Sequence, residues 1–202
     1  MGEINVTNKT DAYNACKSIN DLCVDTGERI IKDLYENINN LKQHWIASNA
    51  VVHINRLIDI YNDLITTMKS AVDNTKLAGD KIITLQKFEV MTGGSCSVGN
   101  ELRISSSFES IAPCAPTEQS DYKKGLDTDY DKLVSICNSY KGFKDNFDMA
   151  QKKLFGLWLD GCNREDTVSA INTFIKNADT NISNITLAHQ ELATVKDYAP
   201  RA

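Results

Sequence analysis

Apolar residues recur at alternating three- and four-residue steps over two long stretches of the chain. One stretch contains Val51, Ile54, Ile58, Tyr61, Ile65, Met68 and Val72. The other contains one polar member, His189, among Val168, Ile171, Ile175, Ala178, Ile182, Ile185, His189 and Leu192. Because this spacing places the residues along one side of a helix, each stretch is predicted to bury that side against other helices. The patterns predict helices over residues 49–87 and 165–195.

Another helical stretch precedes each of these and ends at or near a tryptophan. The earlier one covers residues 11–42, and its apolar pattern changes phase near Thr26-Gly27. Glycine weakens a helix, so a kink or phase shift is expected there. The later one begins within residues 118–122 and ends at Trp158, with its rhythm carried by Tyr140, Phe143, Phe147, Ala150, Leu154 and Leu157. The chain is therefore predicted to form two helical hairpins.

The two hairpins are related as an internal repeat. When Trp45 is aligned with Trp158, Leu41 falls on Leu154 and Tyr61 on Phe174. An isolated two-helix hairpin would leave much of its apolar side in water, so the hairpins are predicted to pack as one antiparallel four-helix bundle. The expected divisions are residues 1–90 for the first hairpin, 91–118 for a central loop and 119–202 for the second hairpin.

The central loop differs in composition from the helices that flank it. Thr92-Gly93-Gly94-Ser95 and Val98-Gly99-Asn100 are turn signals. Leu102, Ile104 and Phe108 are separated by polar residues, which indicates a short strand or β-hairpin. A connection of this length is expected either to pack along the bundle as a crossover or to act as a mobile functional loop.

Charge and hydropathy exclude several classes of function. The net charge of −5 argues against a nucleic-acid surface, which needs clustered lysine and arginine. The first six residues have neither a basic start nor an apolar run, so no signal peptide is expected. No apolar segment approaches the roughly 20 residues that cross a bilayer. We expect synthesis in the cytoplasm and, if the protein is exported, a non-classical route.

The six cysteines contain no Cys-x-x-Cys pair that would indicate a zinc or redox site. Cys16 and Cys23 lie two helical turns apart, too far for a mutual disulfide, and are predicted to be core residues. Cys96 and Cys114 flank the central loop, and a disulfide between them is predicted for a protein that leaves the cell.

Neither a catalytic nor a cofactor motif accompanies the helices. His44 and His53 lack a metal-binding partner four residues further on, and His189 is expected to set register or to lie near a bundle end. A phosphate-binding glycine loop and a nucleophile–base pair are also missing from the sequence. We expect a protein that is not an enzyme and that binds no cofactor, metal or small molecule.

Each hairpin has a tryptophan at its bend followed by a small residue, in Trp45-Ile46-Ala47-Ser48 and in Trp158-Leu159-Asp160-Gly161. With the helices that flank them, these two turns resemble the WXG (ESAT-like) family of type VII secretion. Ala47 stands at the family's glycine position, and Gly161 comes one residue late. The family's export signal, Tyr-x-x-x-Asp/Glu, is missing from the chain. The resemblance implies small hairpins that pair into four-helix bundles and are exported, here as a fused tandem.

The leading expectation is a secreted factor, or an escort for a larger effector, that works through helix–helix contacts with a protein partner. The alternative is a membrane-active helical toxin component, with the central loop as an inserting tongue. Its apolar tip would be formed by Ile104, Phe108 and Ile111. Whether the hairpins pack within one chain or exchange between chains is left open.

Overall fold

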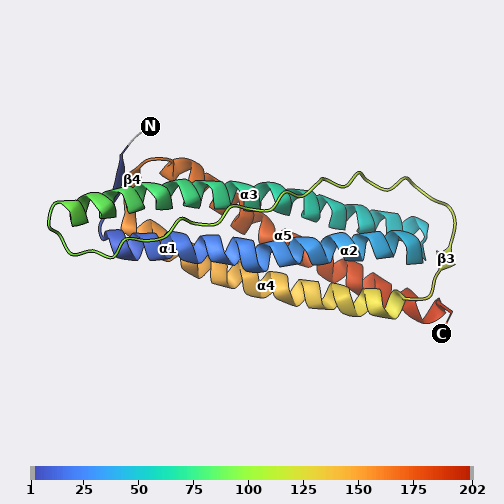
Figure 1. The fold of residues 1–202 in the computed structure, drawn as a ribbon. Helices are drawn as coiled ribbons and strands as arrows, with labels where there is room; N and C mark the ends of the chain where they lie inside the picture. Colours follow the sequence, from blue (N-terminus) through green and yellow to red (C-terminus); the bar gives the residue numbers. More distant parts are fainter. Residues whose placement is uncertain (1–2, 201–202) are drawn as a thin grey trace. The chain divides into compact units, whose positions relative to one another are not determined.

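The computed structural model describes residues 3–200, and 74% of the chain is helical, so the fold is mainly α. The helices are α1 (Lys9–Asp21), the π-helical turn η1 (Leu22–Gly27), α2 (Glu28–His44), α3 (Ser48–Met91), α4 (Leu126–Leu157), α5 (Arg164–Val195) and the short 3-10 helix η2 (Lys196–Tyr198). Four short strands accompany them: β1 (Ile4–Val6), β2 (Trp45–Ile46), β3 (Asp121–Tyr122) and β4 (Trp158–Gly161). Figure 1 shows these elements along the chain.

The chain divides into two compact units, each assembled from three separate segments. The first unit contains Met1–Glu28, Thr66–Ser107 and Phe143–Ile175. The second unit contains Arg29–Ile65, Phe108–Gly142 and Lys176–Ala202. Both units therefore draw on both halves of the sequence, and neither coincides with a predicted hairpin. The predictions about a leader at the start of the sequence and an export motif at its end concern, in part, residues 1–2 and 201–202. These lie outside the described residues.

The π-helical turn confirms the phase shift that the sequence predicted near Gly27. A π turn inserts an extra residue into a helix and rotates the apolar side that follows. As a result Cys16, Ile19 and Cys23 before the shift are fully buried, and so is Leu34 after it. A Cβ on Gly27 would lie 3.2 Å from Sδ of Met68, so the small residue lets α3 pack closely at this point in the first unit.

An aromatic cluster forms part of the core of the first unit. Phe143 and Phe147 on α4 pack with Phe174 on α5, with ring centroids 5.0–5.5 Å apart. All three side chains are almost completely buried. Edge-to-face aromatic pairs add to the stabilisation from buried area, so this cluster joins α4 firmly to α5.

The buried side of α5 differs in part from the predicted stripe. Ile171, Ala178, Ile185 and Leu192 are buried as expected. The remaining predicted members are only half-buried, and α5 instead buries Phe174, Asn181 and Ala188. In the second unit, the amide of Asn181 donates to the hydroxyl of Tyr140 over 3.1 Å, which satisfies a polar group within the core.

Two antiparallel strand pairs link the tryptophan turns to segments that precede helices. In the first unit β1 pairs with β4, so that Val6 lies opposite Trp158. In the second unit β2 pairs with β3, so that Trp45 lies opposite Tyr122. Each pair thus joins the strand before one hairpin to the tryptophan turn of the other.

The β2–β3 pair also explains where α4 begins. The sequence predicted a start within residues 118–122, but Asp121 and Tyr122 form β3 and Gly125 adopts a φ of +109°. A positive φ is incompatible with a helix, so α4 starts at Leu126. The predicted ends of the other long helices agree with the structure within a few residues.

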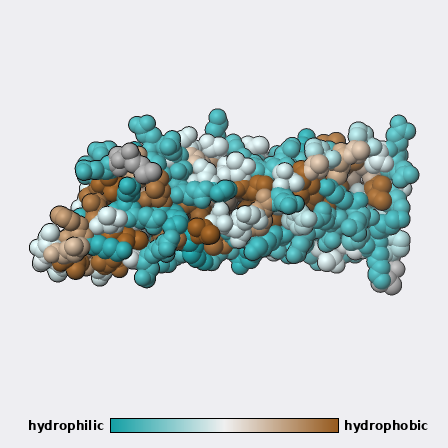
Figure 2. Space-filling view, turned by 45° about the horizontal axis from the view of Figure 1, so that its top comes forward, coloured by the Kyte–Doolittle hydropathy of each residue, from teal (hydrophilic) through white to brown (hydrophobic). Residues whose placement is uncertain are grey.

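Exposed apolar side chains gather at the end of α3. Phe88, Val90 and Met91 are 66%, 45% and 84% exposed. Figure 2 shows tan and brown atoms at the left of the view, where α3 ends. None of the described helices is both long enough and apolar enough to cross a membrane.

Candidate functional site: side chains that hold an extended segment

Residues 94–120, here called the central segment, form neither helix nor strand. In the first unit, residues 94–107 of this segment lie along α1 and α3 (Figure 1). The strand or hairpin predicted around Leu102, Ile104 and Phe108 is therefore wrong. An extended backbone still needs partners for its N–H and C=O groups. In this protein those partners are side chains of the neighbouring helices.

Asn20 on α1 makes the clearest of these contacts. Its Nδ2 donates to the carbonyl of Arg103 over 2.8 Å, and its Oδ1 accepts from the N–H of Arg103 over 3.0 Å. The side chain of Asn20 is fully buried. An amide group in this position offers the same donor and acceptor as a neighbouring β-strand, so it replaces one rung of a β-ladder.

Tyr13 and Gln86 hold the beginning of the segment. The hydroxyl of Tyr13 donates to the carbonyl of Asn100 over 2.7 Å and accepts from its N–H over 2.9 Å. Oε1 of Gln86, which is fully buried on α3, accepts from the N–H of Gly99 over 2.9 Å. A Cβ on Gly99 would lie 2.4 Å from the ring of Tyr13, so only glycine fits at this point.

Glu28 holds the end of the first-unit part. Its Oε1 accepts from the N–H of Ser106 and its Oε2 from the hydroxyl of the same residue, both over 2.6 Å. Charge-assisted hydrogen bonds of this length are stronger than neutral ones. Because Glu28 is only 5% exposed, these bonds also satisfy a carboxylate that would otherwise be buried without partners.

Two side chains of the segment add specific contacts in the first unit. The guanidinium of Arg103 donates to Asp25 over 2.6 and 2.9 Å and to Asp21 over 2.9 Å. The hydrogen bonds to Asp25 raise the pKa of Arg103, and the guanidinium in turn holds the pKa of Asp25 below its ordinary value. Leu102 is 5% exposed and packs closely against Gly79, where a Cβ would lie 2.6 Å from Cδ1 of Leu102.

The second unit holds its own part of the segment in the same manner. Asn62 donates to the carbonyl of Ile111 and accepts from its N–H, both over 3.0 Å. Asn55 does the same for Cys114, at 3.3 and 2.7 Å. The hydroxyl of Tyr61 donates to the carbonyl of Glu109 over 2.8 Å. Within each unit the helices thus recognise the backbone of the segment.

The predicted interaction loop has mixed surroundings. Ile104 is 71% exposed, whereas Phe108 and Ile111 are half-buried. The backbone of Ile111 is held by Asn62, so this part of the loop is fixed in the second unit. Of these three residues, Ile104 is the one with a largely exposed side chain.

The residues of the two tryptophan turns have structural roles. Trp45 and Trp158 are 1% and 0% exposed. The indole N–H of Trp158 donates to the carbonyl of Asp160 over 3.1 Å, whereas that of Trp45 is buried without an acceptor among residues 3–200. Trp45 stacks on His53 with ring centroids 5.8 Å apart. Ala47 is buried next to it, and Ser48 begins α3.

Gly161 allows β1 to pair closely with β4 in the first unit. It lies in β4 opposite Ile4, with a φ of +80°. A Cβ there would lie 1.9 Å from the carbonyl oxygen of Glu3. The glycine is thus required by the close approach of β1 in the first unit.

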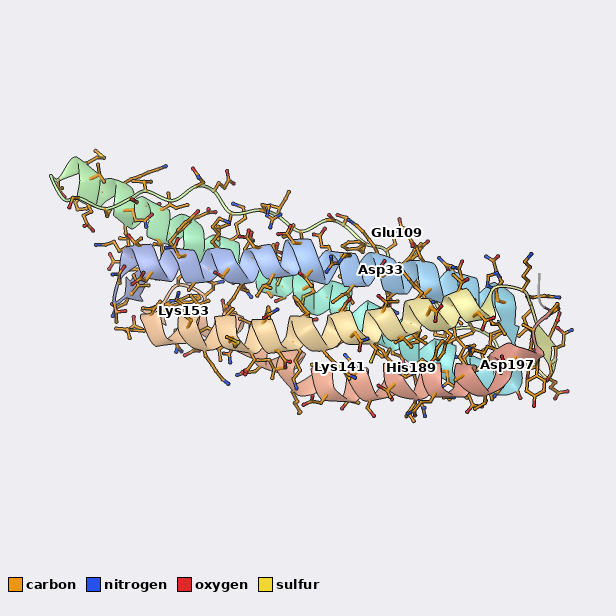
Figure 3. The ribbon with its side chains drawn as sticks, turned by 90° about the horizontal axis from the view of Figure 1, so that it is seen from below. Asp33, Glu109, Lys141, Lys153, His189 and Asp197 are labelled. Carbon is orange, nitrogen blue, oxygen red and sulfur yellow. The ribbon has the colours of Figure 1, made fainter. Side chains whose placement is uncertain are left out.

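Among the described residues, none of the three histidines belongs to a group of side chains that could hold a metal ion. Nδ1 of His44 lies 2.7 Å from Oδ2 of Asp129, and burial raises the pKa of that carboxyl group. Burial lowers the pKa of His53. It also lowers the pKa of His189, with a smaller contribution from Lys141; Figure 3 labels both side chains, on α5 and α4 of the second unit.

The predicted disulfide between Cys96 and Cys114 is not formed in the structure. Both thiols are free, with Cys96 in the first unit and Cys114 in the second. Sγ of Cys96 lies 3.3 Å from the carbonyl of Gln86, and Cys114 is held through its backbone by Asn55. Cys16 and Cys23 are buried as predicted, and burial raises the pKa of Cys16 to about 12.

The apolar periodicity does not predict the residues that hold the central segment. A signal was present, because Asn20 follows Cys16, and Gln86 follows Ile82, at the four-residue step of a buried stripe. An amide in an apolar phase needs a buried hydrogen-bond partner. That partner is a backbone more than ten residues away in the chain, so the sequence pattern alone could not identify it.

Comparisons of the chain with family models, with curated proteins and with solved structures find no match.

Proposed function

We propose that the chain is a fused pair of tryptophan-turn hairpins that forms one antiparallel four-helix bundle. In this proposal it works as a secreted factor of the WXG type, or as an escort for an effector, through contacts with a protein partner. The route would be type VII secretion. The proposal combines the resemblance at Trp45 and Trp158 with the strand pairs at both turns.

The reciprocal strand pairing is the observation that carries the proposal. Trp158 pairs with the strand that precedes the first hairpin, and Trp45 pairs with the strand that precedes the second. In two separate hairpins, such contacts would join one protomer to its partner. Their presence within one chain supports a pseudo-dimer in which each hairpin completes the turn of the other.

The repeat supports the same interpretation. Leu41 and Leu154, which are aligned in the repeat, are both fully buried. The aligned pair one heptad earlier, Leu34 and Phe147, is also fully buried. Equivalent positions in the two halves therefore face a core, as they would in a dimer of related hairpins. The exposed apolar end of α3 and the exposed side of the central segment provide surfaces for a partner protein.

A secretion assay tests the proposal. The protein would be tagged at an internal exposed site and measured in the culture medium of its native host, with and without the type VII ATPase. The proposal predicts that the protein appears in the medium only when the ATPase is present, while a cytoplasmic marker stays in the cells. Equal amounts in both media, or none in either, would contradict it.

A further inference from the structure

The first-unit groove is the set of side chains that hold residues 99–106: Tyr13, Asn20, Glu28 and Gln86. We propose that this groove is a binding site for an extended polypeptide, and that residues 99–106 are a resident ligand which an extended segment of a partner protein replaces. The inference rests on the proposed role as an interaction protein and identifies the kind of partner segment.

The buried polar side chains of the groove need hydrogen-bond partners. Asn20 and Gln86 are fully buried, and Glu28 is nearly so. One side-chain oxygen of each accepts from a backbone N–H of the segment, at Arg103, Gly99 and Ser106 respectively. A buried polar group without a partner is costly, so an empty groove is unfavourable and exchange of one extended chain for another is the favoured event.

The resident segment defines the sequence that fits. Glycine is required opposite Tyr13, where a Cβ would be 2.4 Å from the ring. A leucine three residues later fills the space against Gly79, and the basic residue that follows pairs with Asp21 and Asp25. A hydroxyl residue three positions further donates to Glu28. The pattern is Gly-x-x-Leu-Arg-x-x-Ser, with threonine as an equivalent of serine.

Several features of the resident segment favour its displacement. It has no ladder to a neighbouring strand. The Ile104 side chain is 71% exposed, and the exposed Glu101 makes a surface ion pair with Lys76 over 2.7 Å. The turn before it contains Gly93 with a φ of +91°. Segments with few buried apolar contacts open at low free energy, so the resident can be displaced without unfolding the helices.

A tethered segment competes at an effective concentration of the order of millimolar, so a free peptide must be tested against a weakened resident. The test protein is the full chain with Arg103→Pro and Ser106→Pro. Proline removes the two backbone N–H groups that donate hydrogen bonds to Asn20 and Glu28. Its matched control carries Ile104→Pro and Ser107→Pro, which alter neighbouring positions. The probe is a fluorescent peptide with the sequence of residues 97–108.

Fluorescence anisotropy should show saturable binding of the peptide to the test protein. Binding to the wild type and to the matched control should be at least about tenfold weaker, because the resident still occupies the groove. Adding Asn20→Ala to the test protein should weaken binding at least about tenfold. N-methylation of the peptide at its Arg103 nitrogen should have the same effect, whereas N-methylation at its Ile104 nitrogen should change affinity less than about threefold.

Two results would overturn the inference: no peptide binding by a test protein whose circular dichroism matches the wild type, or binding that is insensitive to both Asn20→Ala and the position of N-methylation. If the double variant does not fold, Arg103→Pro alone serves, with the same expected order of affinities. Because the assay uses purified protein, it fails or succeeds independently of ATPase-dependent secretion.

Discussion

The side chain of Asn20 forms two hydrogen bonds with the backbone of Arg103, although the two residues are 83 positions apart in the chain. A helix ordinarily has no free backbone groups to offer an extended neighbour. Asparagine solves this because its amide carries the donor and acceptor of a peptide group. Asn55 and Asn62 repeat the arrangement in the second unit.

Replacing Asn20 with alanine should destabilise the protein. The variant loses two hydrogen bonds and leaves the backbone of Arg103 without those partners, which costs about 1–3 kcal/mol of unfolding free energy. Asn14→Ala, at an exposed position of the same helix, should change it by less than about 0.5 kcal/mol. Urea denaturation of both variants checks this. A loss no larger for Asn20→Ala than for Asn14→Ala would show that the contact contributes little.

Gly161→Ala should disrupt the β1–β4 pair. The added methyl group would lie 1.9 Å from the carbonyl of Glu3, at a φ that disfavours side chains. We expect a loss of at least about 2 kcal/mol in thermal or urea unfolding. Gly156→Ala is the matched control, because Gly156 lies within α4 and no atom would meet its Cβ within 4 Å. That variant should be neutral or stabilised by up to about 1 kcal/mol. Equal effects of the two substitutions would contradict the assigned role.

The two tryptophans should respond differently to replacement by phenylalanine. Both variants lose buried ring volume, which costs about 1–3 kcal/mol of unfolding free energy. Trp158→Phe also loses the hydrogen bond to Asp160, whereas the indole N–H of Trp45 has no acceptor among residues 3–200. Trp158→Phe should therefore be the more destabilising by about 1 kcal/mol. The reverse order in parallel urea titrations would refute the difference in bonding.

His189 should contribute to a loss of stability in mild acid. Burial and Lys141 lower its pKa in the folded state, and the imidazole ring packs edge-on against Tyr130. Between that lowered pKa and the ordinary value near 6.5, the unfolded chain binds more protons, so stability rises with pH across this window. His189→Gln should reduce the difference in unfolding free energy between pH 7 and pH 5. An unchanged difference would show that His189 titrates alike in both states.

The periodicity predicted the helices well because long apolar stripes are local signals. The ends of α2 and α4 next to Trp45 and Trp158, and the phase shift before Glu28, all follow from three- and four-residue steps. The short strands were missed since each has two to four residues, too few for an alternating pattern. Their pairing is set by contacts between distant parts of the chain.

The candidate site was predicted only in outline. Composition distinguishes the central segment from the helices, but the alternation of Leu102 and Ile104 with polar residues predicts a strand that is not formed. A strand would place Leu102 and Ile104 on the same side, yet Leu102 is buried and Ile104 is exposed, and the neighbours of the segment are helices. Sequence could not show this, because the pattern around Asn20, Asn55 and Asn62 does not indicate which distant backbone these side chains contact.

Residue-resolved amide hydrogen exchange, measured by NMR on the wild-type protein, tests the central claim most directly. That claim is that helix side chains hold the extended segment through its backbone. The N–H groups of Gly99, Arg103, Ser106, Ile111 and Cys114 donate to side chains and should exchange at least about tenfold more slowly than those of Glu101, Ile104 and Ser107. Uniformly fast exchange along residues 94–120 would contradict the account.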